Sequence, residues 1–110
     1  MEDTSFTFNP RKWHRAPVQL PAQYFIKGFS SRYTDCTIIN ISRKGAGVLF
    51  PFTEALKERA AIFFEFIVPK TFERMSVKGE LKYKNHREEG QIGGVEFATL
   101  LPEEVFSKLT

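Results

Sequence analysis

The chain is poor in the residues that build most catalytic and metal sites. Its 110 residues include one cysteine and two histidines. Cys36 has no partner for a disulfide within the chain, which is typical of a reducing compartment such as the cytoplasm. His14 and His86 belong to neither a HExxH motif nor a Cys/His cluster, so the sequence predicts no metal site.

Long apolar runs and nucleotide-phosphate loops are missing too. The longest apolar run, AAIFF before Glu65, is far too short to span a membrane, and the first residues contain no apolar stretch of a secretory signal. No GxxxxGK loop occurs, and Cys36 lies in TDCTII, where a buried thiol is a commoner role than a nucleophile. These absences favour a cytoplasmic protein that is not an enzyme.

Basic side chains gather in the first half of the chain. The net charge is +3; residues 1–50 hold seven basic against three acidic side chains, whereas residues 51–110 hold nine against ten. The excess lies at RKWHR (11–15) and SRKG (42–45). Two small clusters suit a small anion better than duplex nucleic acid, which usually meets a broader basic face. On charge alone, solvated surface groups without any ligand are an equal alternative.

The dominant hydrophobic period is two, which predicts β-strands with one buried face. In residues 75–85 that face would carry Met75, Val77, Gly79, Leu81 and Tyr83. Six short strands are expected, at 17–27, 33–41, 46–50, 60–68, 75–85 and 91–98. A helical turn is expected at 52–59 and a short helix at 102–109, with Pro102 at its first position. The pattern predicts an all-β fold, a six-stranded antiparallel β-barrel with a short C-terminal helix.

Two short motifs flank the first predicted hairpin. They are RxxxR at Arg11 and Arg15, and NxSxxG at Asn40, Ser42 and Gly45. In an antiparallel hairpin the start of one strand lies beside the end of the next. The two predicted strands are similar in length, so we expect both motifs at the same rim of the barrel.

The side chains of these motifs suit an anion that carries purine bases. Arginine binds phosphate, or the O6 and N7 atoms of guanine, through two parallel hydrogen bonds. An asparagine amide and a serine hydroxyl add donors and acceptors, and glycine allows close approach to the backbone. Taken alone, RxxxR is a weak signal, and the asparagine, serine and glycine are also typical of a plain turn between two strands.

At these residues the chain resembles the PilZ domain family, whose members bind cyclic di-GMP. The family signature joins RxxxR to a following [DN]xSxxG on a six-stranded antiparallel barrel with a C-terminal helix, and a GVEF-like feature recurs here at residues 94–97. The resemblance covers roughly residues 11–110. It implies that cyclic di-GMP binds to Arg11, Arg15, Asn40, Ser42 and Gly45, with secondary contacts from Lys12, Trp13 and Arg43. Many members carry an arginine just before RxxxR, where this chain has Pro10; that neighbourhood affects whether one ligand or an intercalated pair binds.

The resemblance implies a receptor that changes conformation with cyclic di-GMP and signals to an effector protein. A flexible arm, residues 1–16, would close over the ligand at the rim of a single PilZ-type barrel, residues 17–110. No further cofactor, no duplex nucleic acid and no membrane span are expected. One alternative is a PilZ-like adaptor that binds protein but no nucleotide, although such members typically lack the arginines. Another is a barrel for single-stranded nucleic acid, although no regular basic and aromatic track marks the predicted sheet.

Overall fold

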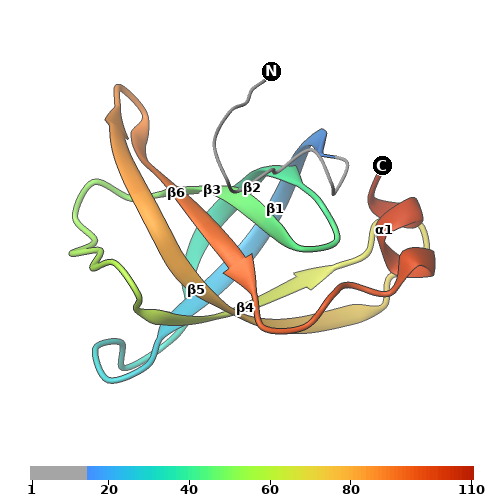
Figure 1. Cartoon of the computed structure of the whole chain (residues 1–110), viewed down its shortest axis with the longest axis horizontal. Helices are drawn as coiled ribbons and strands as arrows, with labels where there is room; N and C mark the ends of the chain where they lie inside the picture. The colour runs from blue at the N-terminus through green and yellow to red at the C-terminus, as the bar shows by residue number, and fades with distance from the viewer. Residues whose placement is uncertain (1–14) are drawn as a thin grey trace, which may run out of the picture.

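The computed structural model describes residues 15–110, which form a closed β-barrel and one helix (Figure 1). All strand pairs are antiparallel, and the barrel closes in the order β1-β2-β3-β6-β5-β4. The elements are β1 Ala16–Ile26, β2 Thr34–Ile41, β3 Gly45–Phe50, β4 Ala61–Ile67, β5 Arg74–Arg87, β6 Gly90–Phe97 and α1 Glu103–Leu109. The predicted six-stranded antiparallel barrel with a C-terminal helix is confirmed.

Inward-facing side chains of the strands fill the barrel. Every second residue of β1 from Leu20 to Ile26 is buried, as the alternating sequence predicts. Tyr24 meets Phe50 edge-on with ring centroids 4.9 Å apart, and Phe50 lies 6.3 Å from Phe64. Aromatic pairs of this kind contribute ~0.5–1.5 kcal/mol each beyond the area they bury. Side chains from three strands thus lock together inside the barrel.

Residues 52–59 form turns at 52–53 and 58–59, joined by irregular chain, and not the helical turn expected from their sequence. Their neighbourhood is organised by a side chain: the Gln91 amide, 3% exposed, donates to three main-chain carbonyl oxygens at 2.7 to 3.3 Å, those of Pro51, Phe52 and Glu54. The carbonyl groups of Phe52 and Glu54 therefore bond to the amide, where a helix would bond them to its own N–H groups, and that of Pro51 accepts from both the amide and the Glu54 N–H. The hydroxyl of buried Tyr24 also donates to the Glu54 carboxylate. We call this end of the barrel, where Gln91 meets the segment after β3, the loop end.

Strand β5 departs from the single apolar face expected of it. Leu81 pairs with Val95 and is buried, whereas Tyr83, predicted on the same face, pairs with Gly94 and is 44% exposed. The pairing register shifts between the two residues, because Lys82 forms a β-bulge and a bulge re-aims the side chains that follow it. The prediction is therefore wrong at Tyr83. Beyond the bulge, β5 and β6 run on as a hairpin that extends past the barrel (Figure 1).

The other end of the barrel, here called the motif end, carries the β2–β3 turn, residues 42–45, together with α1. Figure 1 shows α1 packed at this end. The sequence predicts Pro102 as the first helical residue of α1, but Pro102 is its N-cap residue. The Pro102 carbonyl oxygen accepts hydrogen bonds from the N–H groups of Val105 and Phe106. Within residues 15–110 no helix is long and apolar enough to cross a membrane.

Candidate ligand-binding site

The strand register brings the end of the RxxxR motif to the NxSxxG motif. Ala16 pairs with Ile41 and Pro17 pairs with Asn40, so Arg15 lies beside the end of β2. Its Nη1 donates to Asn40 Oδ1 at 2.9 Å, although 25 residues separate the two in sequence. The hairpin geometry predicted from the sequence therefore places these two motif residues side by side, at the motif end.

Part of the predicted site lies outside the described residues. Arg11, Lys12 and Trp13 belong to residues 1–14, as does nearly all of the predicted flexible arm, residues 1–16. Their contacts with a ligand stay predictions. Arg15 is thus the part of RxxxR from which the geometry of the site can be built.

Asn40 connects the arginine to the neighbouring strand. Its Oδ1 accepts from Arg15 and also from the main-chain N–H of Gly47, 3.0 Å away. Two accepted bonds use both lone pairs of the oxygen and fix the orientation of the amide. Within residues 15–110 no acceptor bonds to its Nδ2, so the amide keeps a donor for a ligand.

Ser42 and Gly45 hold the β2–β3 turn together. Ser42 is 3% exposed; its Oγ accepts from the N–H groups of Lys44 and Gly45, each at 3.1 Å, and donates to the Gly45 carbonyl oxygen at 3.3 Å. A Cβ on Gly45 would lie 2.2 Å from the Val95 carbonyl oxygen, so the missing side chain lets β6 approach the turn. Both residues shape the turn that follows Asn40 and the end of β2, and their contact with a ligand stays a prediction.

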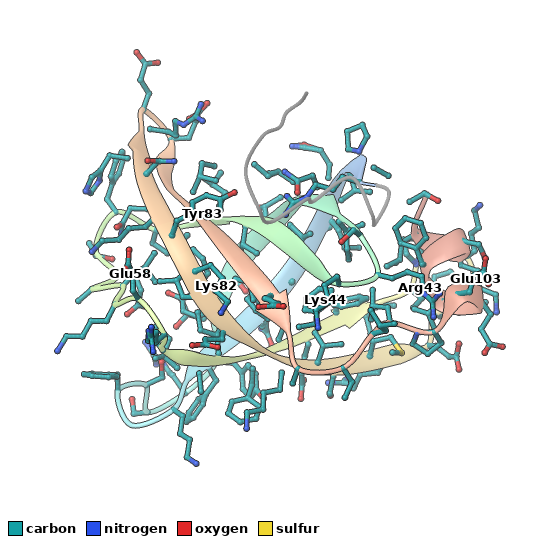
Figure 2. All side chains as sticks on the ribbon, in the orientation of Figure 1. Arg43, Lys44, Glu58, Lys82, Tyr83 and Glu103 are labelled. Carbon is teal, nitrogen blue, oxygen red and sulfur yellow. The ribbon has the colours of Figure 1, made fainter. Side chains whose placement is uncertain are left out.

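Arg43, the predicted secondary contact in this turn, is joined to the segment before α1. Its Nε donates to the Leu101 carbonyl oxygen at 2.7 Å, and its own carbonyl oxygen accepts from the Leu101 N–H at 2.8 Å. Figure 2 shows Arg43 beside α1. The two Nη groups of the guanidinium carry four further donors, so this bond is compatible with a ligand contact. The motif turn and the helix are mechanically connected through this pair.

An ion-pair network joins the β2–β3 turn to β6 and β5 on the outer face of the barrel, near the motif end. Glu96 lies 3.2 Å from Lys82 and 3.5 Å from Lys44, and Lys82 lies 3.4 Å from Glu80 (Figure 2). Partial burial raises the pKa of Glu96, but the two ammonium groups outweigh burial and hold that pKa below its ordinary value. The hydrogen bond to Glu96 raises the pKa of Lys82. These lysines are paired, whereas Arg15 meets no carboxylate among residues 15–110, so it is the better placed to bind an anion.

Gly47 is a part of the site that the sequence reasoning missed. A Cβ at this position would lie 2.5 Å from Asn40 Nδ2 and would push the amide away from its present place. The available signal was the second glycine of GAG (45–47), because glycine inside a strand often marks close approach of another group. Within the described part of the chain, no group of three or more His, Cys, Asp and Glu side chains is arranged to hold a metal ion.

A family model described as PilZ domain matches residues 9–110, which include both motifs and the whole barrel. The chain belongs to the PilZ domain family. The PilZ match begins before Arg11, so the RxxxR motif lies inside the matched residues although most of it is outside the described structure. A search of curated proteins finds no match to the chain.

Solved structures share the PilZ fold at low sequence identity. One is the Bacillus subtilis inhibitor of motility, MotI/DgrA, with a TM-score of 0.71 and 12% identity over 93% of this chain and 49% of that chain. Another is the PilZ domain of CeSA from a cellulose-synthesizing bacterium, with a TM-score of 0.62 and 15% identity over 86% of this chain and 90% of that chain. The likeness shows the fold, and this chain spans about half the length of MotI/DgrA.

Proposed function

We propose that this PilZ domain is a receptor that binds cyclic di-GMP at the motif end and passes the signal to a partner protein. The observation that carries the proposal is the contact between Arg15 and Asn40, which joins the two signature motifs at an exposed rim. Members of the PilZ family bind cyclic di-GMP through these motifs, and this chain keeps every signature residue. The proposal assigns the chain no catalytic step.

The chemistry of the rim supports a ligand with both phosphate and guanine. Arg15 uses one of its five donors on Asn40 and keeps four for phosphate oxygens or for guanine O6 and N7. Asn40 adds its Nδ2 donor, and Arg11 would add a second guanidinium. Hydrogen bonds from arginine to phosphate are charge-assisted and about twice as strong as neutral ones. Two phosphates and two guanines on one molecule can engage these groups together.

The connection from the motif turn to α1 gives the signal a route to the surface. Arg43 belongs to the turn and is bonded in both directions to Leu101, one residue before the N-cap of α1. A ligand that prefers one arrangement of this turn shifts the population of the arrangements by its difference in affinity for them. We infer that an effector protein reads the position of α1 and of the segment that carries RxxxR.

Calorimetry with cyclic di-GMP and with GTP tests the proposal. The cyclic dinucleotide should bind far more tightly, because only it presents two phosphates and two guanines to both motifs at once. Equal binding of GTP would indicate a generic anion site. No binding of either would contradict the receptor role and favour the adaptor that binds protein without nucleotide, and an oligonucleotide that binds more tightly would favour the nucleic-acid alternative.

Emission from Trp13 gives an independent readout. Trp13 is the only tryptophan and stands between Arg11 and Arg15 in the sequence. If both arginines bind the ligand, the indole must change its surroundings, so its emission should shift or be quenched with the same midpoint as in calorimetry. Heat of binding without any change in emission would contradict a role for the segment around Trp13.

A further inference from the structure

A row of four directly paired residues crosses the outer face of β2, β3, β6 and β5. Asn40 pairs with Gly47, Gly47 with Gly94, and Gly94 with Tyr83. Directly paired residues of antiparallel strands point to the same face of the sheet. The neighbours of Gly47 along β3, Ala46 and Val48, are buried in the core, so the row lies on the outside of the barrel.

The two glycines in the middle of the row make room for the side chains at its ends. A Cβ on Gly47 would lie 2.5 Å from Asn40 Nδ2, and a Cβ on Gly94 would lie 2.1 Å from Cε2 of Tyr83. The amide therefore covers the first glycine and the phenol ring covers the second. Because the glycines are direct partners, the amide and the ring approach each other over neighbouring positions of the sheet.

Tyr83 reaches this place only because of the bulge at Lys82. Leu81 points into the core, and without the extra residue Tyr83 would follow it to the same side. The ring is 44% exposed, and within residues 15–110 it has neither an aromatic partner nor a hydrogen bond from its hydroxyl. Figure 2 shows Tyr83 and Lys82 in the β5–β6 region of the barrel. A large aromatic side chain is thus turned out of the core and held beside the motif residues.

We propose that Tyr83 is a ligand-contacting residue whose ring packs against a purine base of the dinucleotide bound by Arg15 and Asn40. This inference rests on the proposed function and extends the site beyond both signature motifs, to the opposite side of the glycine pair. A partly exposed ring supplies a flat apolar surface, on which bases stack with little regard to sequence. Arg15 and Asn40 bind the polar groups of the ligand, and Tyr83 binds the face of a base.

Calorimetric titration of the full chain with cyclic di-GMP tests this role. Tyr83→Ala should weaken binding roughly 5- to 150-fold, the range of a base–aromatic contact, while Tyr83→Phe should bind within about twofold of the parent because the ring remains. Tyr33→Ala is the matched control, since Tyr33 is 38% exposed and lies just before β2, at the end of that strand away from Asn40. Its affinity should equal that of the parent.

Gly94→Ala keeps the ring but moves it, because the new Cβ takes the place of ring atoms at the end of a flexible side chain. It should weaken binding in the parent and have no further effect in Tyr83→Ala. Parent-like binding by Tyr83→Ala, or an equal loss in Tyr33→Ala, would overturn the role of Tyr83 and leave the receptor proposal intact. A loss in Tyr83→Phe as large as in Tyr83→Ala would overturn the packing and point to the hydroxyl. A parent chain that does not bind the ligand would overturn both proposals.

Discussion

Polar side chains organise the chain at both ends of the barrel, but the two ends differ in how buried these side chains are and in how many of their donors are bonded. At the loop end, Gln91 is buried with its amide donating to three carbonyl oxygens, and the Tyr24 hydroxyl is bonded to Glu54. At the motif end, Arg15 is exposed and spends one donor on Asn40. Hydrogen-bond donors therefore remain free for a ligand at the motif end, whereas those of Gln91 and Tyr24 at the loop end are bonded within the protein.

The difference separates residues that build the fold from residues that can bind a ligand. A buried amide with internal partners contributes to stability and would lose its bonds if it turned to a ligand. An exposed guanidinium with spare donors contributes little to stability and can bond to an incoming anion. The division runs through the NxSxxG motif itself, where Ser42 and Gly45 are buried in the turn while Asn40 keeps a donor.

The largest effect on stability is expected from Gly45→Ala. The new Cβ would lie 2.2 Å from a main-chain oxygen of β6, so the paired strands must shift, and we expect a loss of about 3 kcal/mol in the free energy of unfolding. Gly47→Ala is the comparison on the same strand: there the Asn40 amide can turn away, so affinity should fall more than stability. Urea unfolding measures the stability of both variants, and calorimetric titration with cyclic di-GMP measures their affinity. An unchanged unfolding midpoint in Gly45→Ala, with weaker binding, would assign Gly45 to the ligand.

Arg15→Ala should show the opposite behaviour. Binding of cyclic di-GMP should weaken by ~1.5–3 kcal/mol, the scale of a hydrogen bond to a charged group, while the thermal midpoint stays that of the parent. Arg15→Lys should also bind poorly, because an ammonium group cannot make two parallel bonds. Arg32→Ala removes an exposed arginine just before β2 and should alter neither property. A lower melting temperature with normal binding would show that Arg15 serves the fold.

Gln91→Ala should destabilise the loop end by about 1–2 kcal/mol, because three carbonyl oxygens lose the amide together and only that of Pro51 keeps a main-chain donor. Affinity for cyclic di-GMP should not change, since the site is at the other end of the barrel. Gln19→Ala, at an exposed position of β1, is the control and should leave the thermal midpoint unaltered. Weaker binding by Gln91→Ala at unchanged stability would show that the two ends are coupled and that Gln91 serves the ligand site.

Tyr24→Phe tests the same end through its pH dependence and has the smallest expected effect, about 1 kcal/mol at neutral pH. Burial, and then the Glu54 carboxylate, raise the pKa of Tyr24 far above its ordinary value. Above about pH 10 the unfolded chain therefore releases this proton before the folded chain does, so the parent loses stability as the pH rises.

The Phe variant has no such proton to release. The difference in the free energy of unfolding between the parent and Tyr24→Phe should therefore shrink between about pH 8 and about pH 11, as measured by urea unfolding. Tyr33→Phe changes a ring that is 38% exposed and serves as the control. A constant difference in stability between Tyr24→Phe and the parent across this range would contradict the burial of the Tyr24 hydroxyl beside Glu54.

Local sequence accounts for much of the fold because strand alternation is a local property. The run from Val18 to Ile26 already shows which side chains of β1 enter the core, and the observed burial follows it. Alternation does not predict the place of Tyr83, because the pairing of β5 with β6 shifts by one residue between Leu81 and Tyr83. Local sequence also did not predict the conformation of residues 52–59. The Gln91 side chain, from the start of β6, bonds to carbonyl groups at the beginning of this segment.

The sequence by itself determined the all-β class, the barrel and the two motifs, since these depend on periodicity and on residues near one another in the chain. Hairpin geometry also sufficed to bring Arg15 to Asn40. Only the tertiary structure decided which motif residues have donors left for a ligand, because burial and hydrogen-bond partners come from distant strands. It also decided that Tyr83 lies across the Gly47–Gly94 pair from Asn40. That position depends on pairing across four strands and on one bulge, which no local pattern encodes.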